Sequence, residues 1–349
     1  MSPVAGIIAD RLSRKWLIVG SLFVWSAVTF LMGYATTFEQ LYGLRAVMGI
    51  SEALYIPSAL SLIADWHQDK SRSLAIGVHM TGLYVGQAIG GFGATAAAAF
   101  SWQSTFHWFG IVGIAYSVVL IFFLHENPVR MKIEKVVANG ISKGNSIGKG
   151  LLLLFSNISF WVILFYFAAP SLPGWATKNW LPTLFAENLD IPMSQAGPIS
   201  TITIALSSFV GVILGGFLSD RWVLKNIRGR VYTGAIGLGM TIPALLLLGF
   251  GHGFISVIGA GLLFGIGFGI FDANNMPILC QFVSAKYRGT AYGIMNMTGV
   301  FAGAAVTQLL GKWTDGGSLG EGFAMLSIVV ALALGLQIYF LRPKTDNME

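Results

Sequence analysis

Long apolar runs separated by short polar connections extend from residue 16 to residue 341 of the chain. Most of these runs reach or exceed about 20 residues, the length at which an α-helix crosses the hydrocarbon core of a bilayer. The pattern therefore predicts an all-α membrane protein with ten complete spans, at residues 16–35, 38–64, 72–98, 102–124, 158–185, 196–218, 231–250, 253–280, 289–311 and 322–341. The residues before position 10 resemble the end of an eleventh helix.

The composition supports this fold class and argues against an enzyme. The 349 residues are 55% hydrophobic and 10% charged, with a mean hydropathy of +0.72. A soluble domain of this length needs more charge to cover its surface. A single cysteine, Cys280, excludes a disulfide within the chain, and the five scattered histidines show no metal-ligand spacing. We therefore expect no catalytic residues, no metal and no cofactor.

The basic residues predict an orientation in the membrane. Of the 21 lysines and arginines, 18 lie in the connections on one side, whereas Lys178 and Lys312 are assigned to the other side and Arg45 lies within a span. Basic residues collect on the cytoplasmic side of membrane proteins. The linker at 126–150 and the C-terminal tail at 342–349 should therefore be cytoplasmic, in an inner or plasma membrane. The same distribution argues against nucleic acid as a partner.

The chain also contains an internal repeat. "GIIADRLSRK" (6–15) and "GFLSDRWVLK" (216–225) share Gly, Asp, Arg and Lys at identical spacing. The repeat predicts two helical bundles, at 1–125 and 151–341, as in secondary transporters with parallel halves. The first copy lies about 60 residues closer to the start of its half than the second copy does. We therefore expect the N-terminal bundle to lack the first helix and most of the second of a twelve-helix protein.

Several motifs resemble those of the major facilitator superfamily. They are "GIIADRLSRK" (6–15), "RAVMG" (45–49) and "GLYVGQAIGG" (82–91). The segments "RAVMGISEA" (45–53), "NWLPTLF" (179–185) and "YRGTAYGIMN" (287–296) further resemble the anion:cation symporter branch, whose members move sugar acids and other organic anions. The resemblance implies alternating access, with a small organic anion, such as a hexuronate or an aldonate, and protons as the partners of a monomer in the lipid bilayer.

Arg45 and Glu52 are the first candidate functional residues. They lie seven residues apart, so they share one face of a membrane helix. Each costs at least about 2.5–3.5 kcal/mol at the bilayer centre and therefore needs a partner or water. A buried ion pair that fixes helix packing is the structural alternative. In the symporter branch, the matching residues are tied to proton coupling, which implies that Glu52 is the proton-binding group and Arg45 its modulator.

Other polar residues within the spans predict a substrate cavity and a conformational latch. Hydroxyl, amide and carboxylate groups that suit a polyol or a sugar acid occur at Tyr84, Gln87, Tyr166, Asp272, Asn274, Asn275 and Asn296. The duplicated loop charges predict a latch made of Asp10, Arg11, Arg14, Asp65, Asp220 and Arg221. Gly82, Gly86 and Gly90 recur at every fourth residue and predict a smooth face for close helix packing.

Two alternatives remain open within the same fold class. The chain could exchange organic anions or sugar phosphates instead of carrying protons, or it could be a membrane sensor that does not transport.

Overall fold

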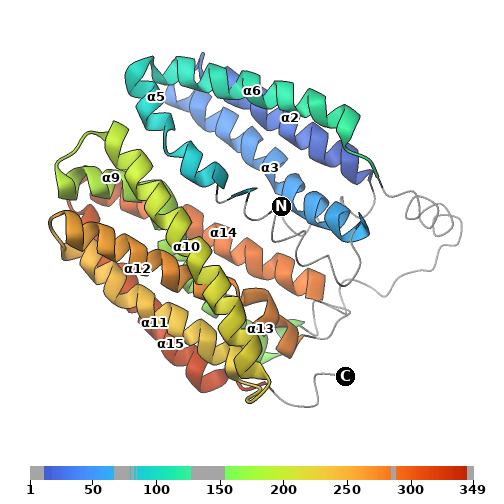
Figure 1. Ribbon diagram of the computed structural model, residues 1–349, viewed down its shortest axis with the longest axis vertical. Helices are drawn as coiled ribbons and strands as arrows, with labels where there is room; N and C mark the ends of the chain where they lie inside the picture. The colour runs from blue at the N-terminus through green and yellow to red at the C-terminus, as the bar shows by residue number, and fades with distance from the viewer. Residues whose placement is uncertain are drawn as a thin grey trace, which may run out of the picture. The chain divides into compact units, whose positions relative to one another are not determined.

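Helices are the regular secondary structure that the described residues form. The computed structural model describes residues 12–66, 79, 82–83, 85–126, 154–283 and 288–343. The helices labelled in Figure 1 are α2 (Arg14–Met32), α3 (Phe38–Trp66), α5 (Gly93–Ala99), α6 (Trp102–Phe123), α9 (Ile158–Leu189), α10 (Met193–Val223), α11 (Gly229–Phe250), α12 (Phe254–Asp272), α13 (Asn275–Phe282), α14 (Arg288–Asp315) and α15 (Leu319–Phe340).

Eight spans within the described residues are long and apolar enough to cross a membrane. This finding confirms the predicted all-α membrane class, but it does not confirm the predicted count of ten. The run at 38–64 forms α3, which is not among the eight. Much of the run at 72–98 lies outside the described residues, as does the stump before residue 10.

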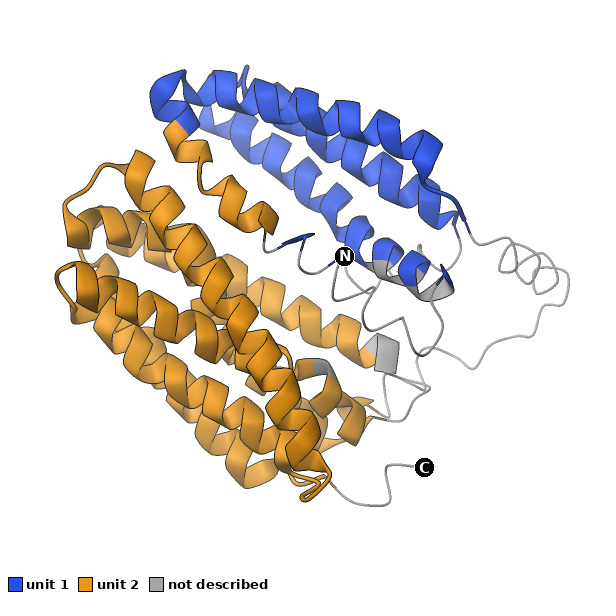
Figure 2. Cartoon of the chain, in the orientation of Figure 1, with its two compact units in different colours: residues 1–83, 96–145 blue, residues 84–95, 146–349 orange. Residues whose placement is uncertain are grey.

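The chain forms two compact units, coloured separately in Figure 2. Unit 1 comprises residues 1–83 and 96–145, and unit 2 comprises residues 84–95 and 146–349. This division differs from the boundary expected from the repeat at one place, because residues 84–95 cluster with the second unit. The segment 84–95 contains a short helix at 85–90 and the first turn of α5.

Local sequence signals set several helix ends. The side chains of Ser13, Ser101 and Asn157 precede α2, α6 and α9 and accept hydrogen bonds from backbone N–H groups of the first turn. These residue types satisfy N–H groups that have no partner within the helix. At the other end of α9, Asp190 adopts a left-handed conformation with φ of 51°, and its N–H reaches Ala186 O. A left-handed residue of this kind terminates a helix.

In unit 1, α2 packs against both α3 and α6. Glu126 ties the end of α6 to the start of α2, because its Oε1 accepts from Ser13 Oγ at 2.5 Å and from Lys15 N at 3.1 Å. Trp66 Nε1 at the end of α3 donates to His125 O at 3.0 Å. The ends of three helices in this unit are therefore joined by the short segment that follows α6.

In unit 2, glycines let α12 approach its neighbours closely. A Cβ built on Gly237 of α11 would lie 2.6 Å from Gly267 O of α12, and one built on Gly267 would lie 2.7 Å from Gly237 O. Gly211 and Gly215 of α10 meet the backbone of α12 in the same way. Small residues permit such backbone contact in membranes, where packing replaces the hydrophobic effect between helices.

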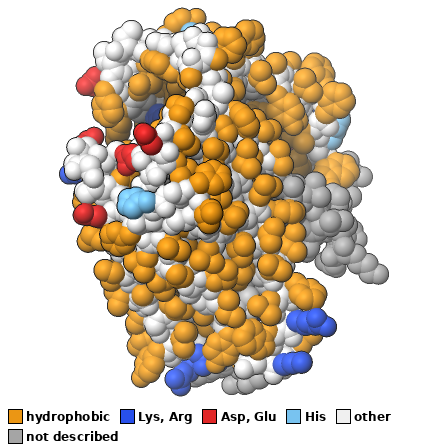
Figure 3. Space-filling view, turned by 60° about the vertical axis from the view of Figure 1, so that its left-hand side comes forward, with side chains coloured by type: hydrophobic (Ala, Val, Ile, Leu, Met, Phe, Trp, Pro, Cys, Tyr) orange, Lys and Arg blue, Asp and Glu red, His pale blue; other side chains and the backbone are white. Residues whose placement is uncertain are grey.

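Large apolar side chains also cover much of the surface. Phe217, Leu224, Phe254 and Ile255 are among the many exposed ones in unit 2. On the face shown in Figure 3, hydrophobic side chains cover the middle, and several Lys and Arg side chains lie at the lower end. Exposed apolar patches larger than a few hundred Å² are rare in soluble monomers. The surface is therefore that of an integral, multi-pass membrane protein.

Candidate functional site

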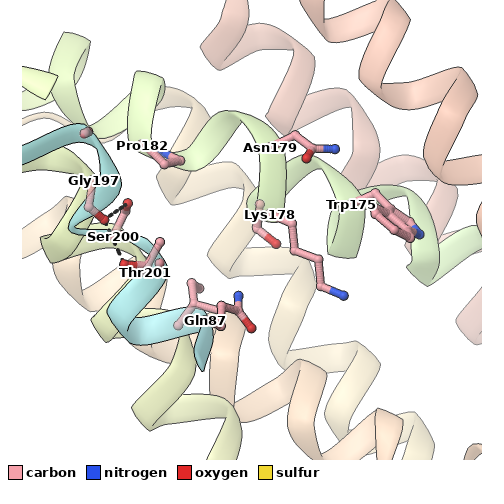
Figure 4. A pocket seen from close by; sticks show the side chains of 13 residues that line it. Gln87, Trp175, Lys178, Asn179, Pro182, Gly197, Ser200 and Thr201 are labelled. Carbon is pink, nitrogen blue, oxygen red and sulfur yellow. Dashed lines mark hydrogen bonds between the residues drawn. The ribbon is translucent and has the colours of Figure 1, made fainter. Parts of the chain in front are cut away.

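A pocket of about 520 Å³ lies within unit 2, between α9, α10 and the segment 84–95. This volume falls in the range of roughly 300–1,000 Å³ that is common for small-molecule sites. The residues that line it are Gln87, Gly90, Gly91, Ala94, Trp175, Thr177, Lys178, Asn179, Pro182, Gly197, Ser200, Thr201 and Ile204. Figure 4 shows eight of these side chains labelled.

Lys178 is the one charged side chain among these lining residues. It extends from α9 on the side of Gln87, and its Nζ lies 5.0 Å from the centre of the Trp175 ring (Figure 4). Its neighbour Asn179 turns toward α14, where its Nδ2 donates to Thr307 Oγ1 at 2.9 Å. The pocket thus combines a single ammonium group with amide and hydroxyl groups, a set that suits a small anion with hydroxyl substituents.

The segment 84–95 contacts α10 closely at one side of the pocket. A Cβ built on Gly197 would lie 2.8 Å from Gly91 O, and one built on Gly91 would overlap Thr201 Oγ1. Thr95 Oγ1 donates to Ser194 O at 2.6 Å. By contrast, a Cβ on Gly82, Gly86 or Gly90 would meet no described atom within 4 Å. The predicted packing at these three glycines is therefore not seen among the described atoms, whereas Gly91 contacts α10.

The predicted substrate residues divide into those in the pocket and those elsewhere. Gln87 lines the pocket, and Tyr84 lies outside the described residues. Tyr166 is 1% exposed in the core of unit 2, where its ring packs edge-on against Phe271. A substrate cannot contact Tyr166 in this conformation. The prediction fails there because a membrane helix is apolar on all sides, so the sequence does not show which face is buried.

The predicted polar groups on α12, α13 and α14 do not line this pocket either. Asp272 is the last residue of α12, and its Oδ1 accepts a hydrogen bond from Asn275 Nδ2 at 3.1 Å. Lys178 is close enough to Asp272 for a Coulombic interaction. Asn274 is fully buried and donates to Ile270 O at 2.8 Å, which is a helix-capping arrangement. Asn296 is half-buried on α14.

Arg45 and Glu52 are both exposed on α3 of unit 1. They interact electrostatically, but no direct ion pair joins them in the part of the chain that the structure describes. The structural alternative, a buried ion pair that fixes helix packing, is therefore not seen within the described residues of unit 1.

The predicted latch is described only at some of its residues. Asp10 and Arg11 lie outside the described residues, as does the side chain of Asp65. Arg14 is the first residue of α2. In the second copy of the motif, Asp220 pairs with Arg230 at 3.7 Å, and Arg221 lies over the ring of Phe217 at 5.2 Å. Each of these contacts lies within unit 2, so the latch between the halves stays a prediction.

Sequence reasoning missed Lys178 as a residue of the pocket. It was assigned to a connection outside the membrane, whereas the structure places it inside α9 and on the pocket wall. One signal was available, because residue 178 falls within the span predicted at 158–185. An ionisable residue within a span needs a polar environment and commonly marks a substrate pathway.

Comparison with known proteins identifies the family. The profile of the Major Facilitator Superfamily matches residues 1–307. The chain belongs to the major facilitator superfamily. It is 26% identical over 366 residues to the D-galactonate transporter of Escherichia coli O6:H1, across 94% of this chain and 80% of that protein. It is 24% identical over 366 residues to the probable anion transporter 2, chloroplastic, of Oryza sativa subsp. japonica, across 99% and 67% respectively.

Solved structures show the same fold. A bacterial homologue of the human lysosomal transporter Spinster, in an inward-facing and unoccupied conformation, aligns with a TM-score of 0.78 at 17% identity. That alignment covers 99% of this chain and 87% of the other. A mutant form of the nucleoside transporter NupG aligns with a TM-score of 0.74 at 15% identity, covering 97% and 86%. Major facilitator proteins are transporters rather than enzymes, and this chain is therefore a transporter.

Proposed function

We propose that the protein carries a small organic anion, such as a hexuronate or an aldonate, together with protons by alternating access. The observation that carries the anion assignment is the single ammonium group of Lys178 in a pocket otherwise lined by neutral side chains. Relatives named as transporters of D-galactonate and, with the qualifier "probable", of sulfoacetate support an organic anion as the substrate.

The pocket chemistry favours a carboxylate that carries hydroxyl groups. The Lys178 ammonium supplies up to three donors and one positive charge, which match a carboxylate. Gln87 offers an amide, and Thr201 offers a hydroxyl that also bonds to Gly197 O at 2.9 Å. These groups both donate and accept, as sugar hydroxyls do. A single ammonium matches a monoanion better than it matches a phosphate with two negative charges.

Glu52 and Arg45 are the proposed proton-coupling pair. Both side chains are exposed on one face of α3, and they interact electrostatically without direct contact. The carboxylate can therefore exchange protons with water, and the arginine's effect on it can change when an anion binds nearby. The amide of a glutamine has the same shape but cannot bind or release the proton.

Uptake into proteoliposomes tests the anion site. We expect radiolabelled D-galactonate or D-glucuronate to accumulate under an imposed proton gradient. Replacing Lys178 by Gln should weaken binding by roughly 10- to 150-fold, since a hydrogen bond to a charged group contributes about 1.5–3 kcal/mol. Lys312→Gln on the exposed last turn of α14 is the matched control and should bind normally. Equal affinities of the two variants would refute the role of Lys178.

The Glu52→Gln variant tests proton coupling separately. It should lose proton-driven accumulation and retain binding and anion exchange across the membrane. Arg45→Lys should recover only part of the transport lost in Arg45→Ala, because an ammonium does not reproduce the planar guanidinium. Wild-type exchange without any response to a proton gradient would instead identify an anion exchanger. Binding without uptake would identify a membrane sensor.

A further inference from the structure

Three aromatic side chains of α9 lie on glycines of α14. The pairs are Phe167 on Gly299, Trp175 on Gly303 and Trp180 on Gly311. Gly299 and Gly303 are four residues apart and therefore lie on the same face of α14, whereas Gly311 lies two turns further along the helix. Of the three aromatic residues, Trp175 also lines the pocket.

The contact between Gly303 and Trp175 is a contact with the face of the indole. A Cβ built on Gly303 would lie 2.5 Å from Cγ and 2.6 Å from Nε1 of Trp175, and closer still to Cδ1. Cγ, Cδ1 and Nε1 are consecutive atoms of the ring. A Cβ in the ring plane, beyond the Cδ1 edge, would be much farther from Cγ and Nε1 than from Cδ1. Because the three distances are nearly equal, the Cβ would lie above the plane of the ring. The Trp175 ring therefore lies flat against Gly303, and any side chain at position 303 would displace the ring.

The same ring contacts the charged group of the pocket. Lys178 Nζ lies over the Trp175 ring, 5.0 Å from its centre, and the two residues are three apart on α9. Indole is the best of the aromatic rings for attracting an ammonium group. A lysine side chain has four carbons and large rotamer freedom, which it loses when it binds an anion. A ring that already holds the ammonium in the pocket reduces that loss.

We propose that Gly303 and Trp175 are positioning residues, which hold the Lys178 ammonium at the pocket wall and thereby raise its affinity for anions. Gly303 acts from α14 without lining the pocket itself. The consequence for anion affinity rests on the proposed function, whereas the positioning of the ammonium does not. The two parts can therefore be measured independently.

The first measurement needs no ligand. The purified full chain is treated briefly with a water-soluble N-hydroxysuccinimide acetate, and acetylation of Lys178 is quantified by peptide mass spectrometry relative to the exposed Lys312. Lys178 is also exposed, but its Nζ lies over the Trp175 ring. Gly303→Ala should raise this ratio several-fold, because displacement of the ring removes the contact that holds the ammonium and leaves the side chain free to react. Gly239→Ala is the matched control, since a Cβ there meets no described atom within 4 Å, and it should leave the ratio unchanged.

The second measurement is binding of radiolabelled D-galactonate. Gly303→Ala should weaken it by roughly 3- to 30-fold, the range that corresponds to the loss of a cation–π contact. Trp175→Leu, which removes the ring without crowding α14, should have the same effects if Gly303→Ala does not fold, and Trp175→Phe should preserve part of both. An acetylation ratio that stays constant in Gly303→Ala and Trp175→Leu would overturn the positioning role. A changed ratio without anion binding in the wild type would support positioning and refute the proposed function.

Discussion

The contact between Gly91 and α10 gives a prediction whose size follows from the structure. In a Gly91→Ala variant, the new methyl group would overlap Thr201 Oγ1. Rotation of that hydroxyl does not relieve the crowding, because the methyl would still lie 2.9 Å from Thr201 Cβ and 3.0 Å from Gly197 O. The segment 84–95 must therefore move away from α10. Overpacking of this kind costs about 1–3 kcal/mol.

The movement should open one side of the pocket. If the arrangement with segment 84–95 packed on α10 is destabilised by about 1–3 kcal/mol, the equilibrium shifts toward the open arrangement by roughly 5- to 150-fold. The assay uses Gln87→Cys in a Cys280→Ser background, with the rate of maleimide labelling measured in detergent. We expect this rate to rise within that range in Gly91→Ala. It should not change in Gly86→Ala, where the added Cβ meets no described atom within 4 Å.

A compensating change separates crowding from general damage. Thr201→Ala removes the overlapping hydroxyl, so it should partly restore slow labelling when combined with Gly91→Ala. Similar labelling rates in the Gly91→Ala and Gly86→Ala variants would show that the packing of residue 91 on α10 does not close the pocket. Rapid labelling that Thr201→Ala does not reduce would show that the effect does not arise from this contact.

Three further predictions concern stability and topology. Tyr166→Phe should leave anion binding unchanged and should not lower the thermal midpoint, because the buried hydroxyl makes no hydrogen bond with a described residue; a large loss of binding would restore Tyr166 as a substrate residue. Asp220→Asn should change the free energy of unfolding by less than about 1 kcal/mol, since the Asp220 side chain is 80% exposed in its 3.7 Å ion pair with Arg230; a loss of transport at unchanged stability would favour the latch. A cysteine at position 140 in a chain lacking Cys280 should resist an impermeant maleimide in intact cells, and labelling from outside would reverse the proposed orientation.

The sequence by itself determined the membrane class, the position of most helices and the family. Each of these depends on properties that are local along the chain. The length of an apolar run decides whether a helix can span a bilayer. The loop signature beginning at Gly6 and the motif beginning at Arg45 are continuous segments, so their resemblance to the superfamily needs no knowledge of packing.

Only the tertiary structure decided which side of each helix lines the pocket. Tyr166 and Lys178 lie on the same helix, about 120° apart around its axis, yet the first is buried in the core and the second lines the pocket. In a soluble protein the polar face of a helix would indicate the outside, whereas a helix between lipid and protein is apolar on both sides. Likewise, the spacing of Gly82, Gly86 and Gly90 predicted a smooth helix face, but it did not show which helix packs nearby. The contact at Gly91 depends on the close approach of α10, which is more than 100 residues away in the chain.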